Sequence, residues 1–143
     1  MTGQAEKVQD LSRAIDPVVD RDNAFFWEAA RHDALVTRLC DACGHSEFPP
    51  VPMCPNCHGL SWTEKPLSGR GTVSGWLKVH HPALPIFTYP LRIVTVKLED
   101  GPELVSNLID ADDIEDADDL PVEVVFAPTR GGWKLPLFRP RKA

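Results

Sequence analysis

All four cysteines of the chain lie within 18 residues, as two Cys-x-x-Cys pairs separated by ten residues. They are Cys40, Cys43, Cys54 and Cys57. Each pair can form a tight turn that directs two thiolates toward one point, and two such turns supply the sulfurs of a tetrahedral structural zinc site. We expect Gly44 and Gly59, which follow the pairs, to adopt the positive φ that these turns often need. Because protein ligands fill all four positions, the predicted role of the metal is structural.

Such cysteines could instead form disulfides, catalyse redox reactions or bind iron. The residues at the N-terminus, Met1 to Lys7, contain no apolar segment for secretion, so we expect a reducing, cytoplasmic location in which thiolates persist. A redox Cys-x-x-Cys would leave a second, identical pair unexplained. Zinc is the expected metal, and iron is the alternative because tetrahedral sulfur also suits it.

Composition and charge narrow the class of protein. The chain has 143 residues, 43% of them hydrophobic and 25% charged, as expected of one soluble unit that can bury a core. No apolar run approaches the roughly 18 residues of a membrane span. Fourteen prolines favour short strands and turns over long helices. The net charge of −6 disfavours nucleic-acid binding, since such proteins usually carry a basic face.

Two short helices are expected before the cysteines. Residues 4–15 have apolar side chains at helical spacing and precede Pro17, which would end a helix. A second helix should begin after Asp20 or Asp22 as N-cap and include residues 25–30. Its aromatic run 25–27 cannot face one core, because successive side chains diverge by about 100°. At least one aromatic should therefore meet a second surface, which is either a neighbouring sheet or a partner.

The rest of the chain predicts a mostly β fold. Residues 35–39 and 60–64 would form the two strands of a zinc ribbon around the cysteines. Five further strands are expected at residues 72–80, 91–98, 103–109, 120–126 and 133–138. Five short strands with a bend at a glycine in the first match a small Greek-key barrel of the OB type. We therefore expect a helical segment at 1–34, a rubredoxin-like zinc ribbon at 35–66 and an OB-fold domain at 67–143.

Charge is distributed unevenly along the predicted barrel. Residues 98–129 contain eleven acidic residues and no Lys or Arg, with the densest run at 110–119. This run lacks the spaced glycine and terminal glutamate of an EF-hand, so a solvated acidic face is favoured over a calcium loop. Basic residues gather near the C-terminus, where they could meet an acidic partner or a phosphorylated ligand. They are Arg130, Lys134, Arg139, Arg141 and Lys142.

No residue is predicted to be catalytic. The cysteines are committed to metal, and the paired histidines His80 and His81 lie at a strand end, where such residues are more often exposed or at an interface. We therefore expect that the chain does not act as an enzyme alone. Three aromatic residues of the barrel strands could stack an adenine but are more often core. They are Trp76, Trp133 and Phe138.

The order of several motifs resembles the DUF35 family over about residues 23–140. The motifs are Phe26-Trp27, Cys40-x-x-Cys43-Gly44, Phe48-Pro49-Pro50, Cys54-Pro55-x-Cys57, Leu67-Ser68-Gly69-x-Gly71-Thr72-Val73 and Pro136-Leu137-Phe138-x-Pro140. This family combines N-terminal helices, a rubredoxin-like zinc ribbon and a C-terminal OB-fold. One departure precedes the fourth barrel strand, where the family often has a glycine and this chain has Asp118-Asp119.

The resemblance implies a function in a complex. Members of the family work beside thiolase-fold enzymes or CoA-ester hydratases, as accessory subunits in acyl-CoA thioester chemistry. The resemblance therefore implies that this chain is a non-catalytic subunit that forms a hetero-oligomer with a thiolase-superfamily enzyme, such as an aldolase. The reaction would cleave or form carbon-carbon bonds, in steroid or other lipid side-chain metabolism. The alternative is a nucleic-acid-binding module of zinc ribbon and OB-fold, which the charge disfavours.

Two further sets of residues are candidates for binding. If the barrel binds acyl-CoA, the phosphates need cations. Candidates by charge are Arg70, Lys78, Arg92 and Arg130. For the partner interface we expect the aromatic helix and the apolar, proline-rich loop between the cysteine pairs to act together. Candidates there are Phe25, Phe26, Trp27, Phe48 and Pro50.

Overall fold

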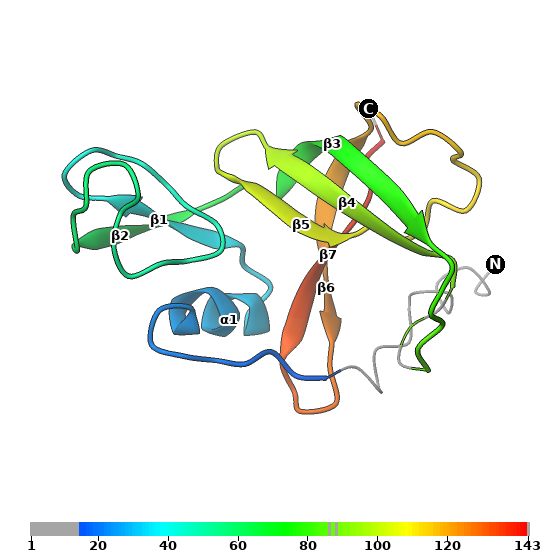
Figure 1. Cartoon of the computed structure of the whole chain (residues 1–143), viewed down its shortest axis with the longest axis horizontal. Helices are drawn as coiled ribbons and strands as arrows, with labels where there is room; N and C mark the ends of the chain where they lie inside the picture. The colour runs from blue at the N-terminus through cyan, green and yellow to red at the C-terminus, as the bar shows by residue number, and fades with distance from the viewer. Residues whose placement is uncertain (1–14, 86, 88, 143) are drawn as a thin grey trace.

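Strands form two antiparallel sheets in the computed structural model, which describes residues 15–85, 87 and 89–142 (Figure 1). In chain order the elements are α1 (Ala24–Arg31), β1 (Val36–Cys40), β2 (Trp62–Pro66), β3 (Arg70–Val79), β4 (Leu91–Leu98), β5 (Glu103–Asn107), β6 (Pro121–Pro128) and β7 (Lys134–Pro140). The mostly β prediction is therefore confirmed. Of the helix expected at 4–15, residues 4–14 lie outside the described part of the chain. Within the described part, no helix is long and apolar enough to cross a membrane.

The larger sheet curls into a nearly closed barrel. Its strand order is β5-β4-β3-β6-β7, and β3 pairs with both β4 and β6. The register of β3 on β4 shifts between Val73 and Gly75, which gives the bend predicted at this glycine. A parallel bridge between Leu108 and Phe138 brings the two outer strands together. This topology is that of the predicted OB-type barrel.

Alternating side chains fill the barrel. On β4, Val94, Val96 and Leu98 are buried, whereas Lys97 between the last two is exposed. Val73 of β3 and Phe138 of β7 meet them in the same cluster. Burying each such side chain contributes about 1.5–3 kcal/mol relative to leaving it exposed. The alternation of apolar and polar residues along the strand therefore predicts correctly which side chains enter the core.

Helix α1 packs below the two sheets (Figure 1) and buries Phe26 in the barrel cluster. Its N-cap is Asn23, so the prediction of Asp20 or Asp22 at this position is wrong. The Asp20 carboxylate instead accepts the backbone N–H groups of Asp22 and Asn23, at 2.8 and 2.9 Å. Because Asp20 stabilises a turn before the helix, the first helical residue moves forward to Ala24.

The acidic segment 110–119 connects β5 to β6 across the outside of the barrel. Its own Ala111 and Ala117 are buried, while its carboxylates are exposed, as expected of a solvated acidic face. Among the described residues, it contributes to no group of three metal-binding side chains. Asp119 has φ +57°, at the place where a glycine is often found in the resembling family. Aspartate tolerates this left-handed conformation better than most residues, so the turn is kept.

Candidate metal centre and partner surface

Two backbone turns of the same form carry the four cysteines. In each turn, the carbonyl of the first cysteine accepts a hydrogen bond from the N–H of the residue four positions later in the chain. The N–H of the same cysteine donates to the carbonyl of the residue five positions later. Cys40 makes these bonds with Gly44 and His45, and Cys54 makes them with His58 and Gly59, all at 2.8 Å. The repeated turn is what aims both sulfurs of a pair at one point.

Positive φ occurs at the same position of both turns. Gly44 has φ +77°, as predicted, and the equivalent residue of the second turn is His58, with φ +66°. The expectation of a positive φ at Gly59 is therefore wrong. Gly59 is needed for another reason, because a Cβ there would lie 3.2 Å from the Cys40 Sγ and 3.3 Å from the Cys57 Sγ. Its backbone lies directly against the sulfur cluster.

The four sulfurs are placed for one metal ion. All four Sγ atoms lie within 4.8 Å of one another, with Cys40 and Cys57 at 3.4 Å and Cys43 and Cys54 at 3.6 Å. Sulfurs about 2.3 Å from a tetrahedral zinc ion are about 3.8 Å apart. Cys40 and Cys54 are buried, whereas Cys43 and Cys57 lie at the surface. The donor set and its spacing fit the structural zinc site that the sequence predicts.

The electrostatics of the cluster favour a bound cation. A hydrogen bond from the Asn56 side chain is the main cause that lowers the pKa of the Cys43 thiol to about 6. The Gly59 N–H also lowers the pKa of Cys57, but its neighbouring cysteines outweigh this and raise it to about 12. Adjacent thiolates repel one another, so all four sulfurs ionise together only around a metal ion.

Arg38 joins the helix to the ribbon, and sequence reasoning missed it. Its guanidinium lies 4.6 Å from the ring centroid of Phe25 and 5.1 Å from that of Trp62. The same group donates to the Val51 carbonyl at 3.0 Å. Nothing in the sequence pairs this arginine with three segments, because the contacts come from the helix, from β2 and from the loop between the cysteine pairs, which only the fold brings together.

The candidate interface residues come together only in part. Phe26 is 3% exposed, so it supports the surface from below. Its ring contacts Trp27 at a centroid distance of 5.0 Å and Phe48 at 5.2 Å. Phe25 turns instead toward Arg38. Trp27, Phe48, Phe25 and Pro50 are all half-buried. Helix α1 and the loop between the cysteine pairs therefore form one surface, and its role as an interface stays a prediction.

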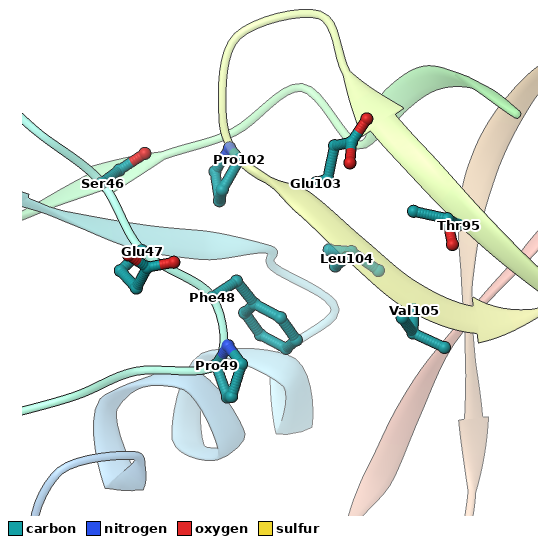
Figure 2. Close-up of a pocket in the computed structure, with 9 residues that line it drawn as sticks. All are labelled: Ser46, Glu47, Phe48, Pro49, Thr95, Pro102, Glu103, Leu104 and Val105. Carbon is teal, nitrogen blue, oxygen red and sulfur yellow. The ribbon is translucent and has the colours of Figure 1, made fainter. Parts of the chain in front are cut away.

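A groove of about 640 Å³ opens beside this surface, between the loop and the β4–β5 hairpin (Figure 2). Its lining residues are Ser46, Glu47, Phe48, Pro49, Thr95, Pro102, Glu103, Leu104 and Val105. Sequence reasoning missed the groove, because its two walls are more than forty residues apart in the chain.

The four candidate cations are spread over the barrel. Lys78 and Arg92 are directly opposite on β3 and β4, but Arg92 is 9% exposed and donates to the Ile114 carbonyl. Arg70, at the other end of β3, is held by Glu99 at 2.8 Å. Arg130 is exposed in the turn between β6 and β7. The structure therefore brings together two of the four, Lys78 and Arg92.

The residues considered for base stacking or catalysis have other contacts. Phe138 is fully buried in the core. An arginine lies over the ring of each tryptophan, Arg92 over Trp76 at 5.5 Å and Arg31 over Trp133 at 4.8 Å. The histidines at the end of β3 are exposed.

Replacing Cys54 by Ser should remove the metal and unfold the ribbon, because metal binding and ribbon folding are coupled. The matched control is His58→Gly, which keeps the four sulfurs and suits the positive φ at that position. Elemental analysis should find one zinc per chain in the wild type and the control, and none in Cys54→Ser. Metal-free wild-type protein, purified under reducing conditions, would contradict the site.

Family models match the two parts of the chain separately. Residues 27–63 match the rubredoxin-like zinc ribbon domain of ChsH2. Residues 64–127 match the C-terminal OB-fold domain of ChsH2. The two matches adjoin, and together they cover the second half of α1, the ribbon and most of the barrel.

Two curated relatives are alpha subunits of hydratases. The chain is 36% identical over 141 residues to the probable enoyl-CoA hydratase alpha subunit of Thermomonospora curvata, covering 96% of this chain and 44% of that protein. It is 34% identical over 139 residues to the 3-oxo-4,17-pregnadiene-20-carboxyl-CoA hydratase alpha subunit of Mycobacterium tuberculosis, covering 92% and 42%. The chain thus spans less than half the length of these relatives.

A solved structure described as the Ltp2-ChsH2(DUF35) aldolase contains a similar chain. The TM-score is 0.80 and the sequence identity 35%, over 87% of this chain and 98% of that one. Both matched domains, their order and this similarity agree with the resemblance seen in the sequence. The chain therefore belongs to the DUF35 family, whose members of this type join a rubredoxin-like zinc ribbon to a C-terminal OB-fold.

Proposed function

We propose that the chain is a non-catalytic accessory subunit that binds and supports a thiolase-superfamily enzyme acting on acyl-CoA thioesters. The observation that carries the proposal is the 35% identity over 98% of a chain in the Ltp2-ChsH2(DUF35) aldolase. The name of that complex supports a reaction that cleaves or forms a carbon-carbon bond. The steroid-derived thioester named for the mycobacterial relative supports a substrate with a steroid or other lipid side chain.

The chemistry of the metal centre is consistent with an accessory role. Four cysteine sulfurs occupy all four coordination positions of a tetrahedral zinc ion, so no position is left for a substrate. The ion can stabilise the ribbon and the loop between the cysteine pairs but cannot act as a Lewis acid without losing a ligand. We place the complex in the reducing cytoplasm, where the four free thiols remain available for zinc.

The surface formed by α1 and the loop between the cysteine pairs is the proposed enzyme interface. Trp27 and Phe48 are half-buried and rest on the Phe26 ring, so their exposed faces are held in fixed positions. Met53, at the end of the loop, is 48% exposed. A loop held at both ends by metal ligands loses little conformational entropy on docking. Aromatic anchors on such a surface commonly carry much of the binding energy.

The second part of the proposal is that the barrel binds acyl-CoA. Lys78 is exposed and stands opposite the buried Arg92, so a phosphate at this end of β3 would contact Lys78 and be attracted by the charge of Arg92. Arg70 is already in an ion pair with Glu99. We therefore place the CoA phosphates near Lys78 rather than near Arg70.

Titration calorimetry with CoA thioesters, with and without the enzyme, should show binding in at least one state. Lys78→Ala should weaken it about tenfold, the typical effect of losing a charge-assisted hydrogen bond. Arg70→Ala is the matched control and should have little effect. Absence of binding in both states would make the role of the chain purely architectural.

Trp27→Ala and Phe48→Ala should each weaken the complex with the enzyme by about 1–4 kcal/mol, which is roughly 5- to 1,000-fold in Kd. Affinity can be measured by titrating the zinc-loaded chain into a purified thiolase-fold enzyme from the same genome. The control Leu77→Ala removes an exposed leucine of β3, 52% exposed, and should leave affinity unchanged.

The melting temperature of each isolated variant separates folding from binding. If either variant loses its fold while affinity per folded molecule stays at the wild-type value, that aromatic belongs to the core and not to the interface. If the wild-type chain does not bind any thiolase-fold enzyme, the proposed function itself is wrong.

A further inference from the structure

One edge of β5 bonds to β4, and the other edge faces away from the barrel. The N–H of Leu108 donates to the carbonyl of Arg92 at 3.1 Å, which makes this a hydrogen-bonded pair. Hydrogen-bonded and non-hydrogen-bonded pairs alternate along an antiparallel ladder. The register Thr95–Val105 and Lys97–Glu103 therefore consists of non-hydrogen-bonded pairs. The N–H and C=O groups of residues 103, 105 and 107 point away from β4.

The chain uses this outward edge at one end only. Ile109, the next outward residue, donates its N–H to the Phe138 carbonyl of β7 at 2.8 Å. Toward the hairpin, the Ser106 hydroxyl still donates to the Pro136 carbonyl of β7 at 2.6 Å, but within the part of the chain that the structure describes, β5 makes no backbone bond to β7 at residues 103–105. Among the described residues, the outward N–H and C=O groups of Glu103 and Val105 have no backbone partner. Two residues of β5 thus present an open strand edge, of the kind that pairs readily with another chain.

The groove of about 640 Å³ runs along this open edge. Figure 2 shows the Phe48 ring and Pro49 facing Leu104 and Val105 across it. Val105 is 64% exposed although it is apolar. The loop between the cysteine pairs therefore forms a second wall opposite β5 without pairing to it. The space between has apolar walls and, on one side, unpaired backbone groups.

We propose that this groove receives an extended segment of a partner polypeptide, which adds to β5 as a further strand. Backbone bonds to Glu103 and Val105 would supply affinity, and contact with Phe48 and Val105 would select an apolar side chain. This inference rests on the proposed function only in requiring a protein partner, whichever enzyme that is.

The charges on the groove define the chemistry of the segment. Its lining includes two carboxylates, Glu47 and Glu103, and no Lys or Arg. Glu47 is bonded to His45 at 3.0 Å, and Lys97 is the cross-strand neighbour of Glu103. An arginine or lysine beside the apolar residue of the segment would complement these carboxylates. The same carboxylates repel the phosphates of CoA, and an acyl chain could not use the open backbone groups.

The test is a selection of displayed random peptides of about twelve residues on the zinc-loaded chain, with binding of the enriched peptides then measured in solution. Val105→Pro removes the outward N–H and the valine side chain, and proline is tolerated on a strand edge when its N–H would face away from the ladder. Val105→Ala is the matched control, because it shortens the side chain but keeps that donor.

Enriched peptides should combine an apolar residue with Lys or Arg. Val105→Pro should weaken their binding about tenfold or more, and Val105→Ala should weaken it less than about threefold. Glu103→Lys should weaken it as well, without any change to the backbone. Hydrogen exchange should slow at the amides of Glu103 and Val105 when peptide binds, and not at Leu104, whose amide already faces β4. Zinc content and melting temperature verify that each variant is folded. If Val105→Pro does not fold, the binding of Glu103→Lys and the hydrogen-exchange data test the proposal instead.

Two results would overturn the inference. One is that no peptide is enriched, or that enriched peptides bind Val105→Pro as tightly as the wild type. The other is that decanoyl-pantetheine binds the wild type and Val105→Pro equally and does not compete with the enriched peptides, which would place the peptides elsewhere and assign the groove to an acyl chain. Because the assay contains no enzyme, its failure is separate from a failure of the proposed function.

Discussion

The metal centre fixes the loop between the cysteine pairs, on which the proposed interface and the groove both depend. Four sulfurs within 4.8 Å of one another hold both ends of the loop between the cysteine pairs. That loop places Phe48 5.2 Å from Phe26, which is itself part of the barrel core. The aromatic surface and the groove beside β5 both include Phe48. Because thiolate repulsion opposes the cluster without a cation, the metal stabilises a surface some distance from the ion itself.

A division of roles follows from this arrangement. The barrel has its own core of alternating residues, and it serves as the support on which α1 and the ribbon rest. The ribbon has two short strands and depends on metal for its fold. The fold alone does not identify a partner, so the function is argued from the surface and from relatives.

The sequence predicted what depends on local spacing. Two Cys-x-x-Cys pairs were enough for the metal ligands, and period-two alternation was enough for the strands of the barrel. Two local predictions were wrong, the N-cap of α1 and the positive φ at Gly59. Asp20 stabilises a turn before the helix instead of capping it, and the second cysteine turn has its positive φ at His58. Arg38 and the groove could not be predicted, because they arise from contacts between segments far apart in the chain.

The affinity of the enzyme for the zinc-loaded and the metal-stripped chain tests this account most directly. Zinc should hold the docking loop in place, so removal with a chelator should abolish detectable binding while the spectrum of the barrel strands persists, and restoring zinc should restore binding. Equal affinity of the two forms would contradict the central claim, because the enzyme would then be bound through a surface that the metal centre does not organise.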